Sequence, residues 1–265
     1  MSKIIVTYLG QCGFLLVFGK TKIVTDPYLS DYVDQHFSSS STPWRRLYSP
    51  PISLQELKPE GILISHSHGD HMDPWTLQPY LYQNDACLAA APAPECMQLE
   101  NIGATRIIYA KAEESFFIGP VKITPIPCAH TQLHLDETGR FHELSYILNY
   151  DGISIFFGGD MSLYDGLEKR LDEAHCSLLL LPVNGRDEDR TGKGIVGNIN
   201  HIEAAHLAAS LHVPYIPMHH DLYDINGCRT EDILSSAQAE GAKAHILKPM
   251  ESLYIAKDGI TAAPK

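Results

Sequence analysis

Three features that this 265-residue chain lacks exclude or disfavour several classes of protein. No apolar run approaches the roughly 20 residues that a membrane-spanning helix needs. The six cysteines are scattered and none lies in a CxxC pair, which argues for free thiols over a disulfide framework or a zinc ribbon. Basic residues are few, 20 Lys and Arg against 32 Asp and Glu. The resulting net charge of −12 disfavours a broad nucleic-acid-binding surface, because phosphate binding needs clustered Lys and Arg.

The beginning of the chain contains no targeting signal. Residues 1–8 alternate in the manner of a first β-strand and lack the apolar core and cleavage site of a signal peptide. We therefore expect a cytoplasmic protein. The hydrophobic content of 44% is normal for a globular protein with a full core. Without an internal repeat or a low-complexity tract, the chain is expected to form a single domain over residues 1–265.

Strand-like and helix-like segments follow one another along most of the chain. The expected strands are 4–9, 13–18, 22–25, 61–65, 87–91, 106–109, 115–118, 121–126, 144–150, 153–157, 178–181, 215–217, 245–248 and 252–255. The expected helices are 74–82, 94–101, 166–174, 202–211 and 231–240. This order predicts an α/β protein in which two sheets pack face to face with helices outside.

A long segment without either pattern covers about residues 27–60. It contains four consecutive serines at 38–41, the run Trp44-Arg45-Arg46 and the pair Pro50-Pro51. Connections of this length inside a compact domain are often functional. We expect this insertion to form a lid over a site or a subunit contact in a homo-oligomer.

The run His66-Ser67-His68-Gly69-Asp70-His71 places four metal-ligating side chains within six residues, directly after a buried strand. Residues two apart on an extended segment point the same way, so His66 and His68 can bind one ion. After the turn at Gly69, Asp70 and His71 face a second position. Imidazole and carboxylate suit Zn²⁺, Mn²⁺ and Fe²⁺. The alternative, a polar turn that is rich in histidine by chance, is much rarer than a metal motif.

A site for two ions needs ligands from elsewhere, and the ends of predicted strands supply candidates. Asp26 follows one strand and could fix the tautomer of a ligand imidazole. Taken alone, it is more simply interpreted as an Asp turn before Pro27, but the other motifs favour the role behind a ligand. His130 follows another strand closely. The nearby His134 and His142 compete with it.

Two later strand ends carry the remaining candidates. Asp160 follows two glycines that allow a tight turn, and its two carboxylate oxygens could bridge two cations. His219 is followed by His220. Adjacent residues on a strand point to opposite faces, so these two should not bind the same ion.

Taken in order, Asp26, the HxHxDH motif, His130, Asp160 and His219 resemble the pattern of the metallo-β-lactamase fold superfamily over nearly the whole chain. The resemblance implies a four-layer αββα sandwich with two mixed β-sheets. It also implies a first metal site, a second metal site with a bridging carboxylate, and Asp26 hydrogen-bonded behind a ligand. The implied first-site ligands are His66, His68 and His130, and the second-site ligands are Asp70, His71 and His219, bridged by Asp160.

Within the superfamily, the chain is similar to the branch of L-ascorbate-6-phosphate lactonase. The similarity lies in the opening motif Tyr8-Leu9-Gly10-Gln11-Cys12-Gly13 and the closing motif Pro217-Met218-His219-His220-Asp221. Residues 181–187 lie where relatives carry a substrate-facing loop. Arg186 in this loop could grip an anionic group as a bidentate donor, or it could pair internally with Asp187. The candidate substrate-binding residues are Asn184, Arg186, His220 and Asp221.

These features predict metal-assisted hydrolysis of a small anionic lactone, ester or phosphoester. One or two divalent ions, zinc or manganese ahead of iron, lower the pKa of bound water to about 7 and make hydroxide available. Asp70 ligates the second ion or, with one ion bound, acts as a general base. Asp160 is the other catalytic candidate.

Two alternative functions remain on the same scaffold. One is a phosphodiesterase or nuclease, which the net charge of −12 disfavours. The other is a di-metal redox or binding protein. The resemblance implies glutamate at the second histidine of the motif in redox members, and this chain has His68 there, which favours hydrolysis.

Overall fold

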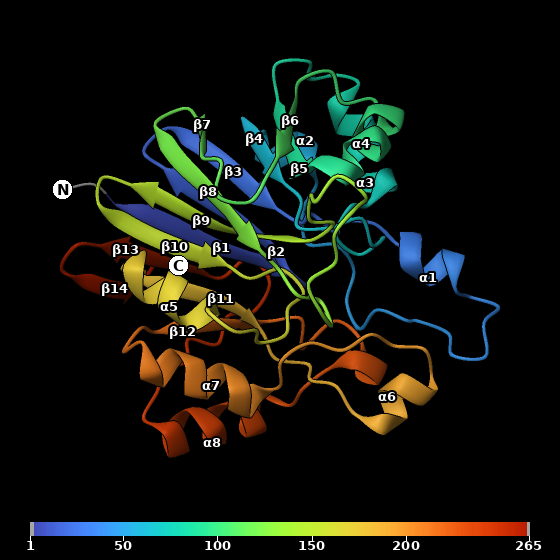
Figure 1. Cartoon of the computed structure of the whole chain (residues 1–265). Helices are drawn as coiled ribbons and strands as arrows, with labels where there is room; N and C mark the ends of the chain where they lie inside the picture. Colours follow the sequence, from blue (N-terminus) through green and yellow to red (C-terminus); the bar gives the residue numbers. More distant parts are fainter. Residues whose placement is uncertain (1–2, 264–265) are drawn as a thin grey trace.

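The first of two β-sheets contains both ends of the part of the chain that the computed structural model describes, residues 3–263 (Figure 1). Its strands are β1 (Ile4–Gly10), β2 (Gly13–Phe18), β3 (Thr21–Thr25), β4 (Gly61–Leu63), β5 (Leu88–Pro92), β6 (Ile107–Ala110), β13 (Ser252–Ala256) and β14 (Gly259–Ala262). They lie in the order β14-β13-β1-β2-β3-β4-β5-β6. The sheet is mixed, because β3 to β6 run parallel and the other neighbours pair antiparallel.

The second sheet is formed by the middle of the chain. Its strands are β7 (Phe116–Ile118), β8 (Val121–Pro127), β9 (Leu144–Tyr150), β10 (Ile153–Phe157), β11 (Leu178–Pro182) and β12 (Tyr215–Met218). They lie in the order β12-β11-β10-β9-β8-β7, with β10 to β12 parallel. The hairpin between β9 and β10 turns at Asp151 and Gly152, both with positive φ, as the sequence predicts.

Helices cover the outer faces of the two sheets. The first sheet is covered by α2 (Leu54–Leu57), α3 (Pro74–Leu81) and α4 (Cys96–Ile102), and the second by α5 (Leu167–Glu173), α7 (His201–Ser210) and α8 (Thr230–Glu240). In β11, Leu180 packs in the core between the sheets, whereas Leu179 and Leu181 pack under the helices. A strand buried on both faces must be apolar throughout. The predicted four-layer αββα sandwich is confirmed.

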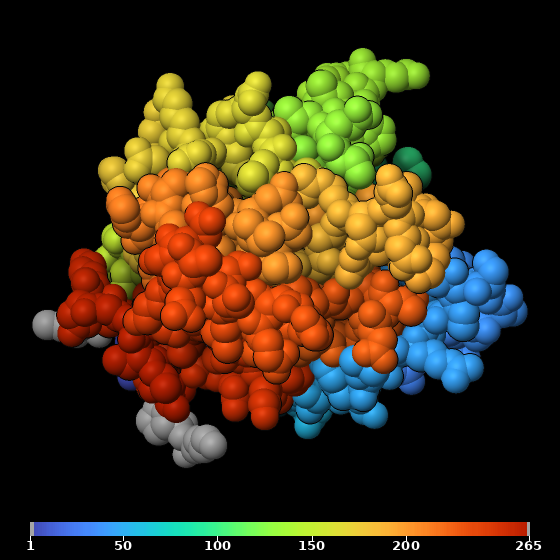
Figure 2. All heavy atoms as spheres, turned by 90° about the horizontal axis from the view of Figure 1, so that it is seen from below, coloured from blue at the N-terminus to red at the C-terminus, as the bar shows by residue number. Residues whose placement is uncertain are grey.

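The insertion lies at one end of the sandwich, where it carries α1 (Tyr32–His36) (Figure 1). Tyr28 and Val33 pack with Leu222 and Tyr223 in a small separate core, and Leu47 N donates to Leu222 O over 2.9 Å. Seen from below, the insertion borders the later chain of the 220s (Figure 2). A further short helix, α6 (Glu188–Gly192), lies at the same end of the molecule.

Most predicted elements are confirmed to within one or two residues, but the strand expected at 245–248 is wrong. Only Ala244 forms a bridge, parallel to Tyr215 at the edge of the second sheet. The chain must then cross to β13 in the first sheet, so it cannot stay paired. Short helices α1, α2 and α6 and the edge strand β14 were not predicted. None of the helices in residues 3–263 combines the length and apolar character needed to span a bilayer.

Candidate metal centre

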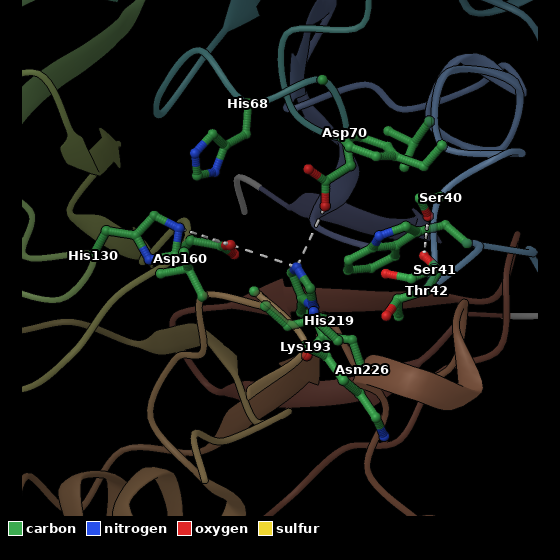
Figure 3. A pocket seen from close by; sticks show the side chains of 17 residues that line it. Ser40, Ser41, Thr42, His68, Asp70, His130, Asp160, Lys193, His219 and Asn226 are labelled. Atoms are coloured by element: carbon green, nitrogen blue, oxygen red, sulfur yellow. Dashed lines mark hydrogen bonds and ion pairs between the residues drawn. The ribbon is translucent and has the colours of Figure 1, made fainter. Parts of the chain in front are cut away.

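Every predicted metal ligand lies just beyond the carboxyl end of a strand, at the end of the sandwich that carries the insertion. The HxHxDH motif follows β4, His130 follows β8, Asp160 follows β10 and His219 follows β12. Asp26 follows β3, the neighbour of β4. The structure brings these side chains together at this end of the sandwich. Figure 3 shows five of them, which are His68, Asp70, His130, Asp160 and His219.

His66, His68 and His130 form one cluster, whose ligand atoms lie within 4.8 Å of one another. His66 Nε2 is 2.9 Å from His68 Nδ1. Burial lowers the pKa of His66 well below its usual value, and the neighbouring imidazoles lower it further. Burial also lowers the pKa of His68. Both rings are therefore neutral near pH 7, which is the form that binds a metal ion.

A second cluster adjoins the first and is centred on Asp160. Its Oδ2 lies 3.5 Å from Nε2 of His71, His130 and His219 alike. Asp70 Oδ2 lies 3.6 Å from His71 Nε2 and 3.5 Å from His219 Nε2. The Asp160 carboxylate thus contacts nitrogens of both clusters, which is the position of a bridging ligand.

The charges of the second cluster depend on one another. Burial alone lowers the pKa of His71, but Asp160, Asp70 and Asp26 together raise it well above its usual value. Burial alone raises the pKa of Asp160, but the imidazoles of His219 and His71 bring it well below its usual range. In the metal-free protein these imidazolium–carboxylate pairs neutralise one another.

The donor set fits divalent metal ions. His71 Nε2 is fully buried and has no hydrogen-bond partner within residues 3–263. A buried nitrogen without a hydrogen bond is costly, and it faces the Asp160 carboxylate at 3.5 Å, a distance typical of ligands that share one cation. Imidazole and carboxylate donors match zinc, manganese and iron.

Asp26 and Ser65 support the ligands from behind. The Asp26 carboxylate accepts hydrogen bonds from Ser65 N at 2.7 Å, Ser65 Oγ at 2.5 Å and His71 Nδ1 at 2.7 Å. A proton on His71 Nδ1 leaves Nε2 as the metal-binding atom. Ser65 Oγ also lies 2.9 Å from His66 Nδ1 and fixes that ring in the same way.

Two residues at the centre were not assigned a role from the sequence. Gln11 Nε2 donates to Asp70 Oδ2 over 2.8 Å and lies 2.9 Å from His219 Nε2. The Cys12 thiol donates to Asp160 Oδ1 over 3.7 Å. Both residues lie in the tight β1–β2 turn. The paired glycines Gly10 and Gly13 around them were the available signal.

A cavity of about 360 Å³ opens directly over the ligands (Figure 3). His68, Asp70, His130, Asp160 and His219 lie in its lining. The insertion contributes one wall and the loop after α6 another. These walls contain Val33, Phe37, Ser40, Ser41, Thr42, Trp44, Lys193, Gly194, Ile195 and Val196.

The four candidate substrate residues do not line this cavity. Asn184 is buried and donates to Asn226 Oδ1 over 2.8 Å. Arg186 forms a bidentate pair with Glu203 at 2.7 and 2.8 Å, at the beginning of α7.

The other two candidates, His220 and Asp221, contact Tyr8 of β1 and Tyr48 of the insertion. Asp221 accepts hydrogen bonds from the hydroxyls of Tyr8 and Tyr48, and His220 stacks on Tyr8. His219 lines the cavity and has a φ of +58°, whereas the next two residues do not line it. Asp221 therefore contacts the insertion through Tyr48, and His220 packs against Tyr8 of β1.

Three histidines after β8 were candidates for one metal-ligand position, and their contacts show which of them occupies it. His134 and His142 stack on each other with ring centroids 4.4 Å apart. They pair with Glu143 and Glu95 respectively. Of the three, His130 alone is grouped with His66 and His68.

The fold and the ligand cluster define an enzyme of the metal-dependent hydrolase class. Residues 21–220 match the family model described as the beta-lactamase superfamily domain. The chain therefore belongs to the beta-lactamase superfamily.

Relatives and solved structures show how far the similarity extends. The chain is 22% identical over 253 residues to a "UPF0173 metal-dependent hydrolase" of Archaeoglobus fulgidus, covering 93% of this chain and 97% of the relative. It is 28% identical over 186 residues to an N-acyl-phosphatidylethanolamine-hydrolyzing phospholipase D of Saccharomyces cerevisiae, covering 66% of this chain and 39% of that protein. Igni18, a metallo hydrolase of Ignicoccus hospitalis, has a similar fold, with TM-score 0.73, 16% identity and coverage of 96% and 99%.

Proposed function

We propose that the protein hydrolyses a small anionic lactone, ester or phosphoester at this metal centre. The observation that carries the proposal is the cavity of about 360 Å³ whose floor is the ligand cluster. A cavity of this size accommodates a small molecule. The reacting bond of a bound substrate would lie over Asp70 and Asp160.

The side chains at the floor have distinct roles in this proposal. A divalent ion bound there supplies a Lewis acid and lowers the pKa of a bound water. Asp70, whose side chain is 19% exposed and held by Gln11, lies at the cavity surface and accepts the proton of the attacking water. Asp160 is buried, and its carboxylate holds the imidazoles of His71 and His130, one from each cluster, next to each other.

The cavity walls support a substrate with an anionic and an apolar part. Lys193 is the cation of the lining. Its Nζ pairs with exposed Asp189 at 2.6 Å, and exposed pairs of this kind are weak, so Lys193 can exchange this partner for a substrate anion. Trp44 and Val196 offer apolar surface to the carbon skeleton. This assigns to Lys193 the role that the sequence suggested for Arg186.

The proposal also includes cytoplasmic residence, which the six unpaired cysteines support. Phosphoesters in the substrate class include phosphodiesters, and the name of the yeast relative describes a phospholipase D that hydrolyses N-acyl-phosphatidylethanolamine. The small cavity favours a compact substrate over a polymer.

The test is metal analysis followed by a substrate screen. Protein purified without chelator is expected to contain zinc or manganese and to hydrolyse at least one member of a panel of sugar-phosphate lactones, carboxylic esters and phosphodiesters. His66→Ala and Asp160→Ala should each lose metal and all turnover. His206→Ala, which changes an exposed histidine paired with Glu240, should retain both. Full metal occupancy in His66→Ala would overturn the ligand assignment, and an inactive metal-loaded protein would overturn the hydrolase proposal.

A further inference from the structure

We propose that Cys12 is a ligand of the second metal position, where it completes a set with His71, Asp160 and His219 and selects a thiophilic cation such as zinc. This inference rests on the metal centre of the proposed function and specifies its second site. It adds a sulfur donor from the β1–β2 turn to ligands from β4, β10 and β12.

The geometry places the thiol among the ligand atoms. Cys12 is fully buried, and its Sγ is 3.7 Å from Asp160 Oδ1. The ligand atoms of Cys12, His71, Asp160 and His219 all lie within 4.8 Å of one another. Sulfur and oxygen bound to one tetrahedral zinc ion, at about 2.3 and 2.1 Å, lie about 3.6 Å apart. The observed separation needs almost no adjustment to admit the ion.

His71 Nε2 independently indicates a ligand at the same point. This nitrogen is buried without a hydrogen-bond partner among residues 3–263, while Nδ1 of the same ring is bonded to Asp26. A thiol that merely donates to Asp160 leaves His71 Nε2 without a hydrogen bond, at 3.5 Å from Asp160 Oδ2 and 3.6 Å from Asp70 Oδ2. A cation bound by Cys12 and His71 together satisfies both groups.

The turn that carries Cys12 is built to hold it in place. The register of β1 and β2 shifts between Tyr8 and Gly10, and Gly10 and Gln11 take φ values of +104° and +54°. Thr25 Oγ1 donates to Cys12 O over 3.3 Å. His219 N donates to Gln11 O over 2.8 Å, which ties the turn directly to a metal ligand. A fixed backbone on both sides gives the sulfur a defined position.

The ligand set has consequences for the chemistry of the two positions. As the sulfur–metal bond forms, the S–H bond breaks and its proton passes to solvent. Thiolate favours zinc over manganese, which prefers oxygen ligands. With Cys12 as the fourth ligand, the second position is complete without Asp70, which stays bonded to Gln11 and keeps its role as proton acceptor.

Cys128 provides a matched control. It is also a buried cysteine beside Asp160, but its Sγ donates to the main-chain oxygens of Asp160 at 3.1 Å and Gly158 at 3.5 Å. It is not grouped with the imidazole ligands. Replacing it by serine changes a thiol near the centre without changing the proposed ligand set.

The experiment is cobalt substitution of the full chain, read by electronic absorption. Wild-type protein titrated with Co²⁺ should develop an intense thiolate-to-cobalt charge-transfer band in the near ultraviolet. Cys12→Ser and Cys12→Ala should lack the band, and Cys128→Ser should keep it. In chelator competition, Cys12→Ser should lower the affinity of the second position for zinc by at least about tenfold. Its affinity for manganese should stay unchanged.

The outcomes separate this inference from the function on which it rests. Cobalt binding without the band in the wild type, or a band that persists in both Cys12 variants, overturns the inference and leaves the metal centre standing. No cobalt binding at all overturns the metal centre itself. Because the wild-type spectrum decides the first point, a variant that fails to fold does not prevent the test.

Discussion

Replacing Asp26 by asparagine should weaken both the second metal site and the fold. Asp26 is fully buried, and its two oxygens accept three hydrogen bonds, from Ser65 N, Ser65 Oγ and His71 Nδ1. Asparagine has nearly the same shape but only one acceptor oxygen. Its amide nitrogen must therefore face a donor, either the Ser65 N–H or the pair formed by Ser65 Oγ and His71 Nδ1.

The expected losses of stability and of metal affinity follow from these contacts. One buried donor without a partner costs about 1–3 kcal/mol, and replacing a charged acceptor by a neutral one costs roughly 1 kcal/mol more. The free energy of unfolding of the metal-free protein should fall by about 2–4 kcal/mol, and Tm by roughly 5–15 °C. Because His71 loses the partner that fixes its tautomer, the affinity for the second ion should fall about 10–100-fold.

Two assays and one control variant test this reasoning. Thermal unfolding of metal-free protein measures the stability loss, and chelator competition measures the second zinc affinity. Asp73→Asn is the control, because Asp73 is equally buried and caps α3 through Trp75 N at 2.9 Å but contacts no imidazole. It should lose stability and keep its zinc affinity. Equal zinc affinity in Asp26→Asn and wild type would refute the role of Asp26.

Three further predictions concern pH, the insertion and a helix cap. Burial lowers the pKa of His66, so its stabilising contribution is lost as pH falls below about 6.5. Nearby carboxylates outweigh burial and raise the pKa of His71, so its contribution is lost as pH rises through that raised value. Tm of the metal-free protein should peak between these limits, and a steady rise from about pH 5 to pH 9 would contradict this account. Deleting residues 38–46 removes a cavity wall. The deletion should raise KM about tenfold or more, or change oligomer size, and should leave the metal content unchanged. Loss of metal would argue against a lid. Asn200→Ala removes a capping box from α7 and should cost about 1 kcal/mol in urea unfolding, whereas Asn200→Ser should cost almost nothing.

Local sequence patterns were sufficient for most of the fold. Buried strands such as β10 and β11 are continuous apolar runs, and the Asp151-Gly152 turn is encoded by two adjacent residues. The strand expected at 245–248 was wrong because apolar character does not say whether a partner strand is within reach. The short helices of the insertion were missed for a related reason. Helix α1 packs against the distant residues Leu222 and Tyr223, and α2 packs against the strands and helices of the first sheet.

The metal-ligand candidates were recognisable because four of them share one short segment and the others follow strand ends. Substrate residues were harder to identify. Arg186 has suitable chemistry, but Glu203, which lies 17 residues further along, occupies its guanidinium. Lys193 and Trp44 come from separate loops, and only the folded chain shows that both face the same cavity.

The sequence by itself determined the alternation of strands and helices and the chemical nature of the ligand set, because hydrophobic periodicity and the HxHxDH spacing act within one segment. The tertiary structure alone decided that Gln11 and Cys12 from the first turn reach Asp70 and Asp160. The physical reason is that such contacts require distances of a few ångströms between residues far apart in the chain. Those distances depend on strand register and loop path, which the packing of the two sheets sets.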